Sequence, residues 1–298
     1  MTWMLLAILS AVFLGLYDVA KKASVQDNAV LPVLLACSAS GLVLLMPIFV
    51  LSTCAPNWAL AHGLFIAPLS LTAHALVLVK AAVVTLSWVL TYFALKHLPI
   101  SLASPVRASA PMFTLLGAIA IFGERPSLRQ ALGIMVILIA YWAFSLIGRS
   151  EGIRFARNAW VASLFLGTLV GAASGLYDKQ LLQGARLPAL ALQFWFTLYN
   201  TLLQSGLVAF LWWPRRAAHT PFRFRWSIFA VGALLLLADA LYFRSLAMPG
   251  ALVSVVSTLR RTNVVLSFAV GTAVFGERKR VAKAMALAGV LVGIFLIL

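Results

Sequence analysis

The stretch PMFTLLGAIAIFGERPSLRQALGIMVILIA (residues 111–140) returns later in the chain as VVLSFAVGTAVFGERKRVAKAMALAGVLVG (residues 264–293), at a constant offset of 153 residues. Each copy places the same four letters, FGER, between two apolar segments. Shorter matches follow the same order along the chain: GLYD at 15–18 and 175–178, and TYFALKHLP at 91–99 with LYFRSLAMP at 241–249. Such self-similarity indicates an architecture built from repeats, so the chain is predicted to contain two copies of one unit.

The composition of these units is that of a membrane protein. Of the 298 residues, 63% are hydrophobic and only 10% are charged, so water is not the main solvent of the chain. Stretches of about 20 apolar residues, enough to cross a hydrocarbon core of about 30 Å, occur ten times. The predicted spans are residues 2–20, 29–53, 73–95, 100–122, 128–147, 158–178, 188–213, 226–246, 250–275 and 281–298.

Ten spans divide into five for each copy, residues 1–147 and residues 148–298. Because five is odd, the second copy must enter the membrane from the side opposite to the first, which gives an inverted repeat. We therefore predict an all-α polytopic membrane protein with ten transmembrane helices in two inverted five-helix repeats. No Lys or Arg precedes the first apolar run, so this run is expected to be a retained helix rather than a cleaved signal peptide.

Gly–Glu turns follow the predicted fourth and ninth helices, at Gly123–Glu124 and Gly276–Glu277. With the helix count and the duplication, these turns resemble the drug/metabolite transporter superfamily, in particular proteins with two EamA-type repeats. The resemblance covers essentially the whole chain and implies a membrane-integral transporter, in the bacterial inner membrane, without a cofactor. Within each turn, Gly is expected to end one helix and Glu to favour the N-terminus of the next.

The basic residues of the loops are distributed unevenly. Loops after odd-numbered helices hold Lys21, Lys22, Lys96, Arg149, Arg154, Arg157, Arg215, Arg216, Arg223, Arg225, Arg278, Lys279, Arg280 and Lys283. Loops after even-numbered helices hold only Arg125, Arg129, Lys179, Arg186 and Arg244. Because basic residues near helix ends are retained in the cytoplasm, this asymmetry predicts that both termini lie outside. Proteins that the chain resembles are usually drawn with both termini inside, so the two orientations stay open.

Three arginines, Arg107, Arg260 and Arg261, fall inside predicted helices. An Arg at a helix centre costs about 2.5–3.5 kcal/mol on insertion scales, so these side chains need partners. Asp239 is the only one of the seven acidic residues that is predicted to lie deep, near the middle of helix 8. Lys80 adds a further cation about 10 Å along helix 3. Positive charge is therefore predicted to be in surplus within the membrane.

Arg107 and Arg260 correspond to each other at the repeat offset of 153 residues. Their positions along helices 4 and 9 predict depths that differ by only about 5 Å, so one bound anion could touch both. Arg261, on the neighbouring helix face, would add a third guanidinium. Guanidinium groups present forked donors that match phosphate or carboxylate oxygens bidentately. The sequence thus predicts a central anion site formed by both repeats.

The segments around these arginines, PVRASAPMF (residues 105–113) and STLRRTNVV (residues 257–265), resemble helices 4 and 9 of plastid phosphate translocators. In that family, a basic residue followed four positions later by Pro, and an adjacent basic pair, hold the substrate phosphate. The resemblance implies that Arg107, Arg260 and Arg261 form a phosphate-type clamp. The chain departs from the pattern because arginines replace expected lysines at the first two positions, and Lys80 has no matched role.

A different interpretation makes the charges structural. Asp239 can form an internal ion pair with Arg260 or Arg244, while the remaining arginines extend to the membrane interface. Three deep cations and one deep carboxylate do not balance, however, and this imbalance favours a bound anion.

Asp18 and Asp178 lie at the predicted last turns of helices 1 and 6. Buried carboxylates of this kind are candidates for proton coupling. Their basic neighbours predict interfacial salt bridges instead, and these neighbours are Lys21, Lys22 and Lys179. Tyr17 and Tyr177 each precede one of the aspartates directly and are expected to face the cavity mouth.

These features predict a secondary transporter that moves a small organic anion by alternating access, either in exchange for another anion or coupled to protons. An empty site with surplus positive charge should cross the membrane poorly, which favours exchange. Two alternatives stay open. One is a proton-coupled exporter of neutral or zwitterionic metabolites such as amino acids, and the other is a membrane protein whose arginines bind a lipid phosphate.

Other functional classes lack a signal in the sequence. Cys37, Cys54 and four scattered histidines show no ligand spacing for zinc or haem, and no nucleophile with an acid/base pair predicts an enzyme. The G-x-x-x-x-G-K-[ST] pattern of ATP-binding loops does not occur. The net charge of +16 is spread over short loops and helices rather than a basic patch, which argues against nucleic acid. The expected partners are a small anionic substrate and membrane lipid, and a homodimer is left open.

Overall fold

The computed structural model describes residues 2–98, 106–107, 109–148, 158–218, 220–263, 266 and 280–297. These residues form helices joined by turns and loops, and no strand occurs among them. The helices are α1 (Thr2–Val25), α2 (Val30–Cys54), α3 (Pro56–Ala61), α4 (Leu71–His97), α6 (Ala110–Phe122), α7 (Leu128–Gly148), α8 (Ala159–Lys179), η3 (Gln180–Gly184), α9 (Ala189–Leu207), η4 (Val208–Trp212), η5 (Trp213–Ala218), α10 (Trp226–Ala247), α11 (Val253–Arg261) and α13 (Arg280–Ile297).

Six helical segments of the described chain are long and apolar enough to cross a membrane: Thr2–Val25, Val30–Cys54, Leu71–Ala94, Ala159–Gly184, Ala189–Ala218 and Trp226–Ala247. Two shorter apolar helices accompany them, Ala110–Phe122 and Leu128–Ala140. The chain is therefore an integral membrane protein, and the predicted all-α class is confirmed. Each of the ten predicted spans contains a helix. In the ninth span, most of the residues after residue 263 lie outside the described part of the chain. That all ten cross the bilayer as an inverted repeat remains a prediction.

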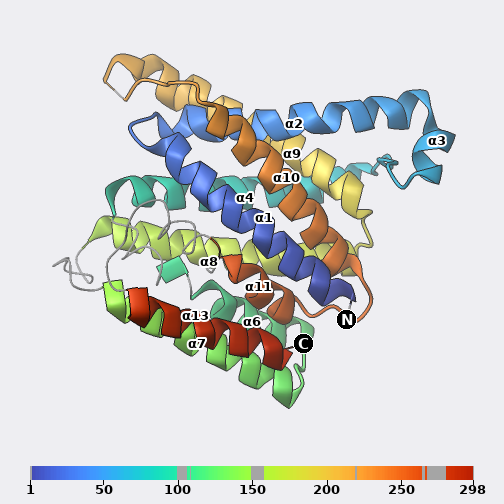
Figure 1. Cartoon of the computed structure of the whole chain (residues 1–298). Coiled ribbons are helices and arrows are strands. Elements are labelled where there is room, and N and C mark those ends of the chain that lie inside the picture. The colour runs from blue at the N-terminus through green and yellow to red at the C-terminus, as the bar shows by residue number, and fades with distance from the viewer. Residues whose placement is uncertain are drawn as a thin grey trace.

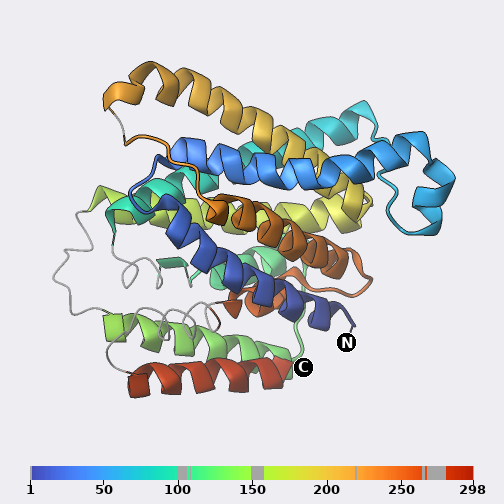
Figure 2. The same ribbon diagram turned by 45° about the horizontal axis from the view of Figure 1, so that its top comes forward.

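The helices pack in pairs that join the two predicted repeats. Figure 1 shows α1 along α10 and α7 along α13, and Figure 2 shows α7 and α13 side by side below the other helices. If each helix is replaced by its counterpart in the other repeat, the α1·α10 pair becomes the α8·α4 pair. The same replacement leaves three pairs unchanged: α2·α9, α6·α11 and α7·α13. All of these pairs occur. They fit a twofold relation between the repeats, while the opposite orientation of the two stays a prediction.

Glycines allow two of the close helix approaches. A Cβ atom built on Gly293 of α13 would lie 2.5 Å from Ile137 Cγ1 and 2.9 Å from the carbonyl oxygen of Gly133, both in α7. A Cβ atom on Gly232 of α10 would lie 2.5 Å from the carbonyl oxygen of Cys37 in α2. Helix backbones can approach this closely only where no side chain separates them.

The turn after α6 has the form that the sequence predicts. Gly123 has a φ of 60°, and its N–H donates to the carbonyl of Ile119 at 3.1 Å. The N–H of Glu124 donates to the carbonyl of Ala118 at 3.2 Å. A glycine in the left-handed region thus ends the helix and satisfies its last carbonyls. The corresponding turn at residues 275–278 lies outside the described residues.

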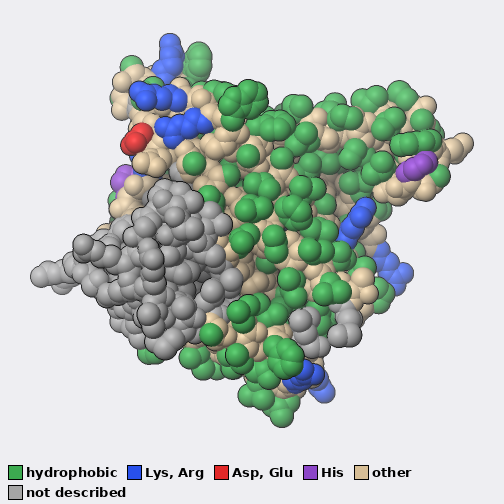
Figure 3. Space-filling model, in the orientation of Figure 1, with side chains coloured by type: hydrophobic (Ala, Val, Ile, Leu, Met, Phe, Trp, Pro, Cys, Tyr) green, Lys and Arg blue, Asp and Glu red, His purple; other side chains and the backbone are tan. Residues whose placement is uncertain are grey.

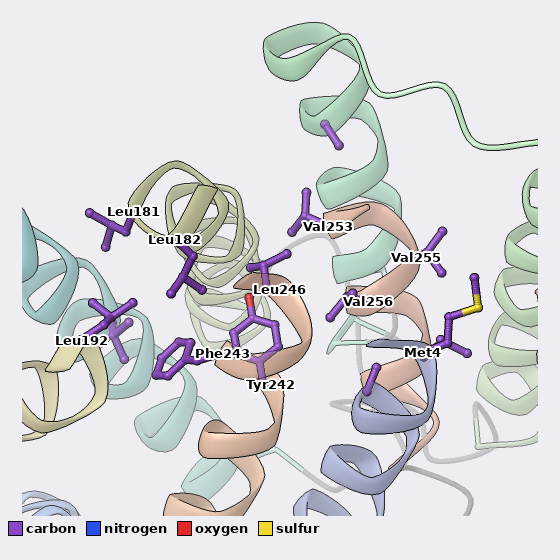
Figure 4. Packing of buried hydrophobic residues seen from close by; sticks show 14 of the residues in the cluster. Met4, Leu181, Leu182, Leu192, Tyr242, Phe243, Leu246, Val253, Val255 and Val256 are labelled. Carbon is purple, nitrogen blue, oxygen red and sulfur yellow. The ribbon is translucent and has the colours of Figure 1, made fainter. Parts of the chain in front are cut away.

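Apolar side chains lie both outside and inside the helix bundle. Figure 3 shows hydrophobic side chains over the middle of the visible face, with Lys and Arg side chains toward its ends, as expected for a surface in contact with lipid. Inside, Figure 4 shows Phe243 and Leu246 of α10 with Val256 of α11, close to Leu182 of η3 and Leu192 of α9. This buried cluster fixes α10 and α11 against the neighbouring helices.

Gly232→Ala should destabilise the fold, because the added methyl group would overlap the α2 backbone, whereas nothing lies within 4 Å of a Cβ at Gly206. Overpacking typically costs about 1–3 kcal/mol, and Ala exceeds Gly in helix propensity by up to about 1 kcal/mol. We expect thermal unfolding in detergent at a lower temperature for Gly232→Ala than for wild type. Gly206→Ala should unfold at the same temperature or higher, and equal melting temperatures for the two variants would contradict the close contact.

Candidate functional site

A cavity of about 200 Å³ lies between helices of both predicted repeats. Its charged lining residues are Lys21, Lys80, Arg107, Asp178, Asp239, Arg260 and Arg261. Three tyrosines complete the polar wall, Tyr17, Tyr92 and Tyr242. Of the residues predicted to bind substrate, the structure therefore brings all except Tyr177 together at one cavity. One of the two coupling candidates, Asp178, also lines it.

Arg260 is held by side chains from two other helices. Its guanidinium forms an ion pair with Asp239 of α10, and its Nε donates to Ser10 Oγ of α1 at 3.2 Å. The guanidinium also lies over the ring of Tyr242, 4.2 Å from its centroid. This pair of Arg260 with Asp239 is the internal ion pair that was predicted from the sequence as an alternative to an anion site. Arg244, the other proposed partner of Asp239, is exposed.

Asp178 forms a second ion pair inside the bundle, with Lys80 of α4. Both residues are buried, and Asp178 also accepts a hydrogen bond from Tyr242 Oη at 3.1 Å. The expected interfacial pairing of Asp178 with Lys179 is wrong, and so is the expectation that Asp239 is the only deep carboxylate. The reason is the length of the span: the helix continues through η3 to Gly184, which places Asp178 well inside it.

Asp18 likewise lies about two turns before the end of α1, because that helix extends to Val25 rather than to residue 20. Asp18 accepts a hydrogen bond from Asn263 Nδ2 at 2.6 Å. Its other oxygen lies 3.9 Å from Arg107 Nη2, at the outer limit of an ion pair. The side chain of Arg107 is 29% exposed, so this arginine is the least tightly held of the cations that contact a carboxylate.

Lys21 was placed in a loop by the sequence analysis, but it is a buried residue of the cavity wall. Its ammonium lies 4.0 Å from the ring centroid of Tyr92 and 5.3 Å from that of Tyr17. The hydroxyl groups of the two tyrosines are 3.1 Å apart. No carboxylate of the described residues forms an ion pair with Lys21. Helical spacing was the missed signal, since Lys21 follows Tyr17 by four residues and shares its face.

Tyr92 and Tyr242 occupy the same position in the matched stretches TYFALKHLP and LYFRSLAMP. Each ring carries a cation, Lys21 over Tyr92 and Arg260 over Tyr242. Cation–π contacts of this kind stabilise a desolvated charge without neutralising it. Tyr177 does not line the cavity, because its hydroxyl donates to the carbonyl of Leu76 at 3.2 Å.

Among the described residues, cations outnumber carboxylates around the cavity. Five cations line it, whereas two carboxylates line it and a third, Asp18, lies beside Arg107. The presence of these carboxylates makes the surplus smaller than the sequence predicted. Among the described residues no carboxylate pairs with Lys21, and an uncompensated charge is expensive in a membrane interior.

Glu124 fixes the helix that carries Arg260 and Arg261. This buried carboxylate accepts hydrogen bonds from the backbone N–H groups of Val253 and Ser254, at 2.7 and 3.2 Å, and from Ser254 Oγ at 2.5 Å. It also forms an ion pair with Lys179 Nζ at 2.6 Å. A negative charge at a helix N-terminus is stabilising. Glu124 was expected to favour the next helix, α7, but it caps α11 of the other repeat instead.

Comparison with known proteins finds a family model that matches the first half of the chain. Residues 1–146, just under half of the chain, match the model of the EamA-like transporter family, whose members are transporters rather than enzymes. No curated protein matches the sequence significantly. Solved structures show the fold: 28 chains match, one of them described as "Crystal structure of protein", with 17% identity and a TM-score of 0.73 over 99% of this chain and 97% of that chain. The local resemblance to plastid phosphate translocators remains a prediction.

Removing one member of the buried Lys80–Asp178 pair should destabilise the protein strongly, because the other charge stays buried without its partner. We expect Lys80→Met or Asp178→Asn alone to cost about 3–5 kcal/mol in unfolding free energy. The double variant should recover part of this loss, since the introduced amide oxygen could still accept the hydrogen bond of Tyr242. Thermal and denaturant unfolding of the four proteins in detergent measures this coupling. Additive losses would show that the two side chains do not interact.

Glu124→Gln should weaken the attachment of α11, because an amide loses the charge that Lys179 and the helix N-terminus require. Hydrogen bonds to a charged group contribute about 1.5–3 kcal/mol, so a loss of roughly 2 kcal/mol is expected. Asp27→Asn is the matched control, since Asp27 is exposed and its φ of 52° suits Asn. A melting temperature of Glu124→Gln equal to that of the control would contradict the role of Glu124.

Proposed function

We propose that this chain, whose residues 1–146 match the EamA-like transporter family, is a secondary active transporter of a small organic anion. The observation that carries the proposal is a pair of weakly held cations in the cavity wall: Lys21, which no described carboxylate pairs, and Arg107, whose contact with Asp18 is 3.9 Å long. An anion that enters the cavity would supply negative charge to both. Its forked oxygens, in a phosphate or carboxylate, match the guanidinium groups of Arg107, Arg260 and Arg261.

We propose that the substrate binds by replacing the carboxylates that now contact the arginines. The guanidinium of Arg260 is occupied on one side by Asp239 and stacked on Tyr242, so a substrate oxygen would compete with the Asp239 carboxylate. Arg107 is easier to recruit, because its contact with Asp18 is 3.9 Å long and Asp18 already accepts from Asn263. Lys21 joins the proposed site as a cation that no described carboxylate neutralises.

Exchange transport follows from the same weakly held cations. A cavity whose Lys21 has no described carboxylate partner would be costly to carry through the membrane interior, and a bound anion lowers that cost. We therefore propose that the side of the membrane to which the cavity opens changes mainly when substrate is bound. The proposed location is the inner membrane of a bacterium. Access would alternate by rocking of the two repeats, as in other transporters with inverted repeats. The Glu124 contacts with α8 and α11 tie one end of the cavity and would have to break when that end opens.

A proton-coupled exporter of neutral or zwitterionic metabolites is the second candidate. The Arg260–Asp239 and Lys80–Asp178 pairs favour it, because they show that two of the five lining cations have carboxylate partners within the protein. In that case the arginines serve structure, and a carboxylate such as Asp178 carries the proton. The two candidates differ in whether Arg260 must contact the substrate.

A thermal-shift screen tests the anion site directly. Inorganic phosphate, phosphorylated metabolites and dicarboxylates are the probes, and a ligand at 100 times its Kd stabilises a protein by about 2.7 kcal/mol. We expect at least one probe to raise the melting temperature of wild type and of Arg244→Gln, but not that of Arg260→Gln. Arg244→Gln is the matched control, because this arginine is exposed. In liposomes, a protein with the stabilising anion inside should take up the labelled anion faster than one in empty liposomes.

Two outcomes would contradict the anion exchanger. A probe that stabilises Arg260→Gln as strongly as wild type would remove Arg260 from the site. Equal uptake into loaded and empty liposomes would exclude exchange. Recovery of transport in the Arg260→Gln/Asp239→Asn double variant, relative to Arg260→Gln alone, would favour the exporter, since the two residues would then act only as an internal pair.

A further inference from the structure

A short basic and aromatic segment connects two membrane-spanning helices of the second predicted repeat. The stretch WPRRAAHTPFRFRW, residues 213–226, runs from the end of the Ala189–Ala218 span to the start of the Trp226–Ala247 span. Because both flanking helices cross the membrane, the segment between them must lie at the bilayer surface. We refer to its exposed arginines, Arg215, Arg216 and Arg223, as the arginine strip.

The backbone of this segment is fixed by a buried side chain from the turn between α1 and α2. Asn28 donates from Nδ2 to the carbonyl of Arg223 at 2.7 Å and accepts from the N–H of Arg223 at 2.9 Å. A further bond runs from Arg225 Nη1 to the carbonyl of Ala23 at 2.6 Å. The segment is therefore held in place by α1 rather than left as a free loop.

The fixed backbone sets the directions of the side chains. Arg225 has extended dihedral angles, and in an extended chain successive side chains point to opposite sides. Phe224 and Trp226 accordingly meet edge to face, with ring centroids 5.8 Å apart, and both are largely exposed, at 61% and 81%. Aromatic rings on one side and Arg223 on the other give the segment an apolar and a cationic edge.

The charge of the arginine strip is not neutralised by the described part of the protein. None of its three arginines forms an ion pair with a described carboxylate. Arg216 instead lies over the ring of Trp213, 4.6 Å from its centroid, and donates to the Trp213 carbonyl. Figure 3 shows Lys and Arg side chains gathered at the end of the molecule where α9 and α10 meet.

We propose that the arginine strip binds the headgroups of anionic phospholipids. Guanidinium groups match phosphate oxygens, and the exposed aromatic rings beside them fit the boundary between headgroups and acyl chains. The loop charges predict that this side of the membrane is cytoplasmic, where anionic lipids attract basic segments. An acidic protein is a less suitable partner, because Phe224 and Trp226 are exposed aromatic rings at the start of a membrane span, where lipid rather than a charged protein surface is expected. The proposal does not depend on the cargo of the cavity.

Lipid binding to the full-length protein tests the proposal. Native mass spectrometry would count bound phosphatidylglycerol and phosphatidylcholine, and thermal unfolding would measure the stabilisation by each lipid. The strip variant is Arg215→Gln/Arg216→Gln/Arg223→Gln. The matched control, Arg125→Gln/Arg129→Gln/Arg186→Gln, removes three exposed arginines elsewhere in the chain, of which Arg129 lies in the first turn of α7. A fourth variant, Phe224→Ala, removes one ring and leaves the charges in place.

Wild type and the control variant should bind phosphatidylglycerol in preference to phosphatidylcholine. Each arginine near an anionic surface contributes roughly a fivefold factor in affinity, so the strip variant should lose phosphatidylglycerol binding about tenfold or more. Phe224→Ala should weaken the binding of both lipids alike, because a ring does not distinguish their charge. Equal preference in wild type and the strip variant would overturn the proposal. So would an equal loss in the control variant, which would reflect total charge, or capture of an acidic protein without any preference for phosphatidylglycerol.

Discussion

The cost of placing charge inside a membrane protein determines how the helices meet around the central cavity. Three cations contact carboxylates from other helices: Lys80 with Asp178, Arg260 with Asp239 and Arg107 with Asp18. Tyr242 connects the first two pairs, since its hydroxyl donates to Asp178 and its ring supports Arg260. Because removal of either member of a buried pair leaves an uncompensated charge, these contacts fix which helices can be neighbours.

The two predicted repeats hold the charged side chains of the cavity with different residues. Tyr92 and Tyr242 hold equivalent positions, but the first carries Lys21 from α1 and the second carries Arg260 from α11. Asp178 is paired by a lysine, whereas Asp18 is held mainly by Asn263. For the proposed anion exchanger, the internal carboxylates hold the arginines in place until a substrate competes for them.

Two contacts outside the cavity control the elements that line it. Glu124 links α6 to the N-terminus of α11 and to Lys179, and so positions the helix that carries Arg260. At the other end, Asn28 attaches the segment before α10 to the turn that follows α1. Asp239 and Tyr242 lie on α10, so the proposed lipid site and the cavity share a helix. Both contacts join elements that are far apart in the sequence, and neither was predicted.

The sequence alone determined the helical membrane class and the positions of the helices, because apolar length and composition are local properties that any membrane span must satisfy. It also named six of the seven charged residues that line the cavity, since a charge inside an apolar run is visible without a structure. Helix ends were less well predicted, and this misplaced Lys21 and Asp178, whose helices run on past the predicted boundaries. Only the tertiary structure decided the partners, because the pairing of Lys80 with Asp178 or of Glu124 with α11 depends on which helix faces meet, and no local pattern encodes that.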